Sequence, residues 1–206
     1  MIETKTTTQI AKPLAATRKI PLSEPCLQGN EWRYLKECLD TGWVSSAGPF
    51  VKRFEQAFAD YVGTGHAVAV VNGTAGLHVA LQVASVQPGD EVLVPALTFI
   101  APVNAIHYRQ AHPVFLDADP QTWQMDVRKL EAFLKDECDV RETLSGSRSC
   151  WNKQTGRRVR AILPVHLLGL ACPMDDIMAL AKHYHLKIIE DAAEAIGVRY
   201  HDRPVG

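Results

Sequence analysis

The 206-residue sequence lacks the features that mark membrane, secreted and metal-binding proteins. No apolar run approaches the roughly 20 residues of a transmembrane helix, and the Thr- and Lys-rich N-terminus has no apolar block typical of a signal peptide. The five cysteines are odd in number and show neither a CxxC pair nor zinc-ligand spacing: Cys26, Cys38, Cys138, Cys150 and Cys172. We therefore expect a cytoplasmic protein with reduced thiols, no metal site and no membrane partner.

An excess of positive charge is also absent, since 22 basic and 23 acidic residues give a net charge of -1. The only short basic run, Arg157, Arg158 and Arg160, lies in a polar stretch and is more typical of a solvated loop than of a phosphate-binding patch. No GxGxxG or GxxxxGK motif occurs, which counts against a nicotinamide-dependent enzyme. We expect no nucleic-acid partner.

The N-terminal 19 residues are polar and are predicted to form a flexible tail, so that residues 20–206 carry the fold. Two helices should follow. The first begins after Asn30, a good N-cap, and ends at Gly42; the second begins near Pro49 and ends at Gly63. The second helix places four aromatic residues on one stripe: Phe50, Phe54, Phe58 and Tyr61.

From residue 66 onward, short apolar strands alternate with helices. The predicted strands are His66–Val71, Glu91–Pro95, His112–Asp117, Val159–Val165 and Lys187–Glu190. Five helices are predicted between and after these strands. One starts at about Thr74, one runs through Ile100–Tyr108, one is capped by Asp126, one follows Pro173, and one spans Ala192–Ile196. The polar stretch Val140–Arg158 is predicted to be a long surface excursion. This alternation predicts an α/β fold with a mostly parallel sheet and helices on both faces.

Ligands of open parallel sheets gather at the carboxyl ends of the strands, so the turns that follow the strands are the places to search. After the first predicted strand, Thr74 and Ala75 open a helix and could bind a phosphate, although the same pattern is also an ordinary N-cap. After the second strand, Phe99 could stack on a planar ligand, but the pattern alone favours a core position. His166, after the fourth strand, could contact a substrate, but the pattern is at least as consistent with a buried, hydrogen-bonded histidine.

The last predicted strand delivers three carboxylates, Glu190, Asp191 and Glu194, into the turn that follows it. A charge at the end of a buried strand is costly unless it is paired. Asp191 could simply cap the next helix, or it could pair with a ligand cation such as a pyridinium nitrogen. A phosphate site, an aromatic plate and an acid together describe one cofactor, pyridoxal 5'-phosphate.

Five ordered stretches strengthen this interpretation: GWVSSAGPFVKRFEQAFADYVG, VNGTAGLHVAL, PGDEVLVPALTFIAPVNAI, PVHLLG and IIEDAAEAIG. In this order they resemble the DegT/StrS-type nucleotide-sugar aminotransferases, which have the aspartate aminotransferase fold, and the resemblance extends from Ile20 to Gly206. It implies the N-terminal part of a pyridoxal-phosphate-binding large domain. A small C-terminal domain of the family is absent from this sequence.

The resemblance also assigns roles to residues. Thr74 and Ala75 match the phosphate-binding residues, Phe99 the ring-stacking aromatic, and Asp191 the partner of the pyridine nitrogen. Glu194 falls near the ring hydroxyl, where glutamate points weakly to 4-amino-sugar substrates. The implied partners are a nucleotide-linked keto-deoxysugar, an amino-acid donor expected to be glutamate, and a second copy of the full-length protein, with the segment GWVSSAGP at the active-site entrance.

One departure from the family concerns the lysine that holds the cofactor as a Schiff base. The family places it beyond the segment matching Gly206, and no lysine of this sequence fits that position, so the chain contains no catalytic residue of its own. We therefore expect residues 1–206 alone to be inactive. Two alternatives remain: a sugar dehydratase, if histidine replaces the lysine, or a non-catalytic fragment.

Overall fold

A computed structural model describes residues 20–21, 24–142 and 146–206, and the predicted tail of residues 1–19 lies outside them. The chain divides into two compact units, Met1–Gly48 and Pro49–Gly206. Within the first unit, α1 (Glu31–Thr41) follows Asn30 and ends at Gly42, whose φ of 74° is a left-handed conformation that glycine adopts readily. The helix predicted here is confirmed.

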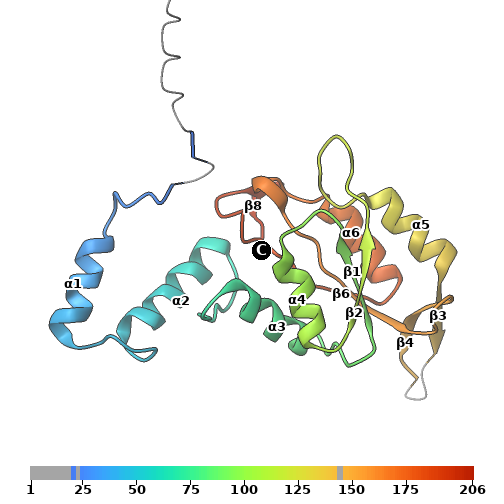
Figure 1. Cartoon of the computed structure of the whole chain (residues 1–206), viewed down its shortest axis with the longest axis horizontal. Coiled ribbons are helices and arrows are strands. Elements are labelled where there is room, and N and C mark those ends of the chain that lie inside the picture. The colour runs from blue at the N-terminus through green and yellow to red at the C-terminus, as the bar shows by residue number, and fades with distance from the viewer. Residues whose placement is uncertain (1–19, 22–23, 143–145) are drawn as a thin grey trace, which may run out of the picture. The chain divides into compact units, whose positions relative to one another are not determined.

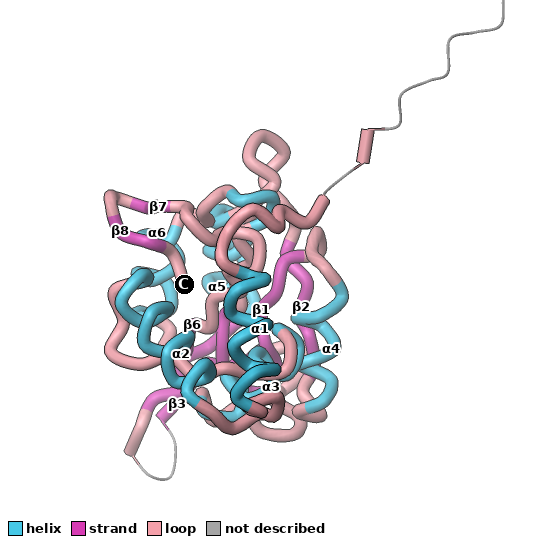
Figure 2. Tube along the Cα trace, turned by 90° about the vertical axis from the view of Figure 1, so that its left-hand side faces the viewer, coloured by secondary structure: helices cyan, strands magenta, loops and turns pink. Residues whose placement is uncertain are grey.

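The second unit is built on a six-stranded mixed sheet (Figure 1). Parallel pairing joins β2 to β1, β1 to β5 and β5 to β6, and the antiparallel hairpin of β3 and β4 is added to β5. The strands are β1 (Glu91–Pro95), β2 (His112–Leu116), β3 (Cys138–Glu142), β4 (Arg148–Asn152), β5 (Arg158–Ile162) and β6 (Lys187–Ile188). A separate antiparallel pair, β7 (Arg199–Tyr200) and β8 (Arg203–Pro204), lies near the end of the chain (Figure 2).

Helices cover both faces of this sheet, as predicted. Val92 and Val94 of β1 point to a core shared with α3 and α4, whereas Leu93 between them points to a core shared with α5 and α6. Figure 1 shows α4 and α5 on opposite sides of the strands. The helices of this unit are α2 (Pro49–Val62), α3 (Gly73–Val83), α4 (Ile100–Tyr108), α5 (Val127–Glu137), α6 (Met174–His183) and the 3-10 turn η1 (Leu167–Gly169).

The polar stretch predicted to be a surface excursion instead forms the β3–β4 hairpin, so that prediction is wrong. Cys138 and Cys150 face the core from its two strands, and this apolar alternation is too short to stand out among Ser, Gly and charged residues. Arg158 and Arg160 are not in a solvated loop either, because both lie on β5. Arg158 binds the Asp90 carboxylate, and Arg160 donates to the Ala84 carbonyl at 3.1 Å.

Three further predictions need correction. His66–Val71 is not a strand, since it belongs to no ladder among the described residues. The strands predicted at Val159–Val165 and Lys187–Glu190 end earlier than expected, because β5 ends at Ile162 and β6 at Ile188. Ala192–Ile196 forms successive turns rather than a helix. The Ala195 amide donates to the Ala192 carbonyl, and no run of helical hydrogen bonds follows it among the described residues.

All five cysteines are free thiols. Across the described ranges, no helix combines the length and apolarity needed to cross a bilayer.

Candidate functional site

The carboxyl ends of three neighbouring parallel strands lie at one edge of the sheet. β1 pairs with β5 and β5 with β6, so the residues after these strands leave the sheet on the same side. Phe99 follows β1, His166 follows β5 and Asp191 follows β6, and a parallel bridge joins Val165 to Asp191. This is the edge at which open α/β sheets bind ligands.

Glu190, the first carboxylate after β6, is paired with a buried histidine. Its Oε2 lies 2.9 Å from His166 Nε2 and accepts the Gly206 amide at 3.2 Å. His166 Nδ1 accepts the Cys172 amide at 3.0 Å, so this nitrogen carries no proton and the Nε2–H donates to Glu190. The hydrogen bond from His166 holds the pKa of Glu190 below its ordinary value. Glu190 therefore has a protein partner.

His166 itself is fully buried, and both of its ring nitrogens are hydrogen-bonded. The structural alternative for this residue is confirmed. Cys172 belongs to the same cluster: burial raises the pKa of its thiol to about 11, and the protonated thiol donates to the Val165 carbonyl at 3.2 Å. The cluster fixes the end of β5 against the end of β6.

The backbone of Asp191 is fixed by two hydrogen bonds, whereas its carboxylate makes only one local contact. Its amide donates to the Pro164 carbonyl at 2.9 Å, and its carbonyl accepts the His166 amide at 3.0 Å. Its Oδ1 accepts the Ala193 amide at 3.1 Å, a local turn contact. Within the described part of the chain, Asp191 forms no ion pair. A half-buried carboxylate at the ligand-binding edge is thus free to pair with a cation from outside the chain.

Glu194 is exposed, and its Oε2 accepts the Leu168 amide at 2.6 Å. This contact ties the turn after β6 to the turn after β5, where Leu168 has a φ of 55°. Glu194 therefore shapes the rim of the same edge.

Phe99 presents an exposed ring. Its side chain is 73% exposed at the start of α4, so the core position favoured by the pattern alone is wrong. The neighbouring Thr98 has a buried hydroxyl with no hydrogen-bond partner among the described residues. An exposed aromatic face beside Asp191's edge of the sheet can stack on a planar ligand.

Thr74 and Ala75 form the first turn of α3, as predicted, but strand pairing does not bring them to the edge that carries Asp191. The segment before them, His66–Val71, lies outside the sheet. The Ala75 amide donates to Asn72 Oδ1 at 2.9 Å, so the ordinary N-cap is present. In this structure, one amide of the predicted phosphate site is occupied by the chain itself.

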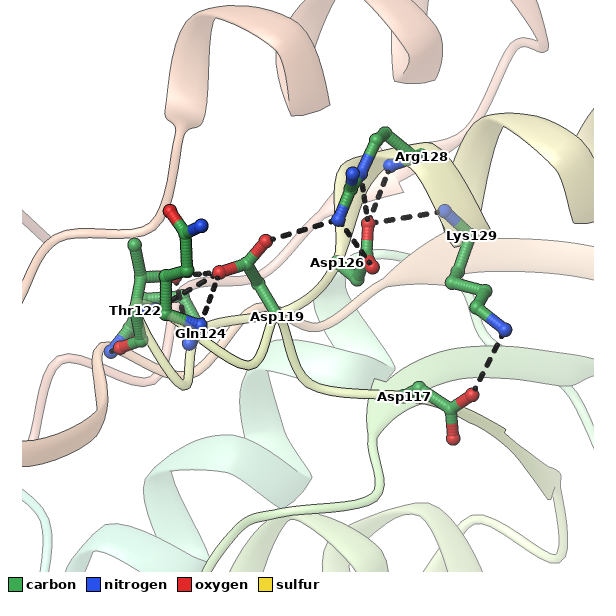
Figure 3. A network of polar contacts seen from close by, with 8 residues as sticks. Asp117, Asp119, Thr122, Gln124, Asp126, Arg128 and Lys129 are labelled. Atoms are coloured by element: carbon green, nitrogen blue, oxygen red, sulfur yellow. Dashed lines mark hydrogen bonds and ion pairs between the residues drawn. The ribbon is translucent and has the colours of Figure 1, made fainter.

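Sequence reasoning missed Gln124, which supports the turn after β5. It is 2% exposed; its Nε2 donates to the Leu167 carbonyl at 3.0 Å, and its Oε1 accepts the Leu167 amide at 3.1 Å. Figure 3 shows it beside a polar network in which Arg128 joins Asp119 and Asp126. The amides of Thr122 and Gln121 hold the pKa of Asp119 below its ordinary value. A glutamine in a polar loop gave no sequence signal for this role.

A largely apolar cavity of about 520 Å³ lies beside α2 and the turns after β6. None of the five predicted cofactor residues lines it. Its walls are formed by Phe54, Phe58, Tyr61 and Val62 of α2, by Thr64 and residues 66–70, by Ala192, Ala193 and residues 195–197, and by residues 204–206. Three of the four aromatic residues of the predicted stripe, Phe54, Phe58 and Tyr61, thus line this cavity.

Comparison with known proteins gives a consistent result. The sequence profile described as the DegT/DnrJ/EryC1/StrS aminotransferase family matches residues 25–206. The chain is 44% identical, over 91% of its length and 45% of the other's, to a GDP-perosamine synthase from Caulobacter vibrioides. It thus spans about half the length of the curated relatives it matches.

Solved structures agree. An aminotransferase from Psychrobacter cryohalolentis matches with a TM-score of 0.75 and 34% identity, over 90% of this chain and 42% of that one. The pyridoxamine phosphate form of a sugar aminotransferase from Streptococcus pneumoniae matches with a TM-score of 0.73 and 28% identity, over 91% and 46%. The chain is therefore similar to less than half of each solved structure, and to about the N-terminal 45% of the GDP-perosamine synthases.

Proposed function

Because the chain belongs to the DegT/DnrJ/EryC1/StrS aminotransferase family, we propose that it is the cofactor-binding portion of a pyridoxal-phosphate-dependent sugar aminotransferase. The reaction transfers an amino group, from glutamate as the expected donor, to a keto carbon of a nucleotide-linked deoxysugar. The similarity to a GDP-perosamine synthase favours a GDP-linked sugar as the acceptor.

The observation that carries this proposal is the position of Asp191. Its carboxylate lies at the ligand-binding edge, its backbone is fixed on both sides, and its neighbour Glu190 is already hydrogen-bonded to His166. Pyridoxal phosphate, when bound, acts as an electron sink for the carbon that carries the amino group. The Asp191 carboxylate would keep a pyridine nitrogen protonated, which a neutral side chain cannot do.

The other four residues would hold the ring and its phosphate. The exposed ring of Phe99 would cover one face and exclude water from it. The start of α3, at Thr74 and Ala75, would donate a hydroxyl and amides to the phosphate once Asn72 releases its bond to the Ala75 amide. Glu194, on the rim, would lie near the ring hydroxyl. These donors and the carboxylate fit an anionic ester at one end and a cationic ring nitrogen at the other.

The remaining features of the complete enzyme are proposed from the family alone. They are a homodimer with its active sites between subunits, the segment Gly42–Pro49 at the entrance, and a lysine supplied beyond the region matched here. Without that amine, we expect residues 1–206 alone to show no transamination.

Binding of pyridoxamine 5'-phosphate tests the cofactor site without requiring the lysine. Isothermal titration calorimetry of the 206-residue chain should show saturable binding. The substitution Asp191→Asn should weaken it roughly 10- to 100-fold, because a charge-assisted hydrogen bond is lost. Asp202→Asn, at an exposed carboxylate in the β7–β8 turn, is the matched control and should bind like the parent. Binding that is indifferent to Asp191→Asn, or no binding at all, would refute the proposal.

A further inference from the structure

Two turns meet at the ligand-binding edge, one after β5 and one after β6. The turn after β5 places a leucine in an unfavourable conformation: Leu168 has a φ of 55°, and the following Gly169 has a φ of 74°. Consecutive positive φ values are typical of a type I′ turn, in which glycine, asparagine and aspartate predominate. Leu168 gains no burial in return, since it is 65% exposed. Contacts of the backbone, rather than packing of the side chain, must hold this turn.

Gln124 provides the first of these contacts. Its side chain is 2% exposed, and its carboxamide forms two hydrogen bonds with one residue: Nε2 donates to the Leu167 carbonyl at 3.0 Å, and Oε1 accepts the Leu167 amide at 3.1 Å. The Leu170 amide closes the turn by donating to the same carbonyl at 3.1 Å. A buried and fully bonded carboxamide is rigid, so it fixes the direction in which the next amide, that of Leu168, points.

The amide of Leu168 points at Glu194. It donates to Glu194 Oε2 at 2.6 Å, a short hydrogen bond to a carboxylate. The two turns also lie close along their backbones, because a Cβ at Gly169 would come within 3.3 Å of the Glu194 carbonyl oxygen. One carboxylate oxygen is thus held by the turn after β5. Within the described part of the chain, the other oxygen, Oε1, has no hydrogen-bond partner.

A carboxylate with one fixed oxygen and one open oxygen suits a ligand that carries a cationic hydrogen-bond donor. The cofactor proposed above has such a group in its aminated form. In pyridoxamine phosphate, the protonated amine lies on the ring substituent next to the ring hydroxyl, near which Glu194 is proposed to lie. A neutral alcohol in place of that amine would lose the charge that strengthens the hydrogen bond.

We propose that Glu194 recognises the amine of pyridoxamine phosphate, and that Gln124 and the Leu168 amide position the Glu194 carboxylate for this contact. Gln124 is then a positioning residue, which acts through the turn and touches no ligand. The inference rests on the proposed function, and it adds which form of the cofactor this chain binds most tightly.

Two cofactor analogues that differ in a single group test the proposal: pyridoxamine 5'-phosphate carries the amine, and pyridoxine 5'-phosphate carries a hydroxyl in its place. Titration calorimetry of the 206-residue chain should give an affinity about tenfold higher for the amine. Glu194→Gln should abolish most of this preference, and Gln124→Met should reduce it about threefold. Gln121→Met, the same change at an exposed glutamine in the same loop, should leave the preference at the parent value.

The ratio of the two affinities separates this contact from effects on folding, because a general loosening of the site weakens both analogues alike. Asp191→Asn should also weaken both alike, since both contain the pyridine nitrogen. Circular dichroism checks that each variant keeps its fold. If Gln124→Met does not fold, Gly169→Ala disturbs the same turn beside the Glu194 carbonyl and should likewise reduce the preference.

The outcomes distinguish this inference from the proposed function. Binding of neither analogue would refute the proposed function and this inference with it. Binding of both analogues with equal affinity, or a preference that Glu194→Gln leaves unchanged, would overturn the inference alone. A preference that depends on Glu194 but is unchanged in a folded Gln124→Met or Gly169→Ala variant would overturn the positioning role of the turn.

Discussion

Carboxylates at the two ends of the parallel strands differ in how completely they are paired within the fold. At the amino end, Asp90 and Glu91 are buried, and both carboxylates accept hydrogen bonds from side chains. Arg158 donates to Asp90 through two nitrogens, at 2.7 and 3.0 Å. Asn152 and Thr155 donate to Glu91. At the carboxyl end, Asp191 has one local amide contact and no ion pair among the described residues. The charges at the amino end are paired within the fold, whereas at the carboxyl end the Asp191 carboxylate has no ion-pair partner among the described residues, as the proposed cofactor site requires.

The largest expected effect is at the amino end. Arg158→Met leaves the buried Asp90 without its cation and should lower the free energy of unfolding by about 3 kcal/mol, measured by urea denaturation. The control is Lys129→Met, which removes an exposed pair with Asp117 (Figure 3) and should cost at most about 0.5 kcal/mol. Equal effects of the two substitutions would erase the contrast between buried and exposed charge.

A smaller effect is expected at Asp126, a carboxylate on the carboxyl side of the sheet that has a structural role. Its Oδ1 accepts the amides of Arg128 and Lys129 at the start of α5. Asp126→Ala should lower the free energy of unfolding by about 1 kcal/mol, and Asp126→Asn should recover most of it, because asparagine also caps helices. If Asp126→Asn costs as much as Asp126→Ala, the cap is not the cause.

Glu190 should contribute stability that depends on pH. Because its pKa is lowered in the folded protein, its contribution is present above the ordinary carboxyl value of 4.5 and is lost as the pH falls through the lower folded value. Glu190→Gln should therefore lower the free energy of unfolding by about 1 kcal/mol at pH 7, and the difference should shrink in acid. Glu131→Gln, at an exposed position on α5, serves as the control. A difference that grows in acid would contradict the assigned sign.

The smallest effect is expected at Asp191. Asp191→Asn should change the free energy of unfolding by less than about 0.5 kcal/mol, because asparagine can keep the contact with the Ala193 amide. Thermal and urea denaturation would measure this, and a loss above about 1.5 kcal/mol would show that Asp191 has a structural role.

Local signals predicted most of the fold. Asn30 and Asp126 marked helix starts, Gly42 marked a helix end, and the continuous apolar run of β1 indicated a strand buried on both faces. The errors arose where distant residues decide the outcome. His66–Val71 is a strand by composition, but pairing requires a neighbour, and the β3–β4 hairpin is stabilised by packing rather than by its composition.

The candidate site was predictable to a similar degree. Position after a parallel strand predicted that Asp191 and Phe99 lie at one edge of the sheet, but the pattern alone favoured a core position for Phe99 and left a helix cap open for Asp191. The pairing of Glu190 with His166, 24 residues apart, depends on β5 lying beside β6, and the contact of Glu194 with Leu168 depends on the same alignment. The burial of Gln124 followed from no pattern in the sequence.

The cap on α3 has a consequence for affinity. Asn72 acts as a built-in competitor, since its carboxamide occupies the amide that an incoming anion would need. An anion bound there, as we propose, would first have to displace it, and its affinity would be reduced by the cost of uncapping a helix, about 1 kcal/mol or a factor of roughly five. If the proposed phosphate site is at this helix start, replacing Asn72 by glycine should remove the competitor and increase the affinity for inorganic phosphate.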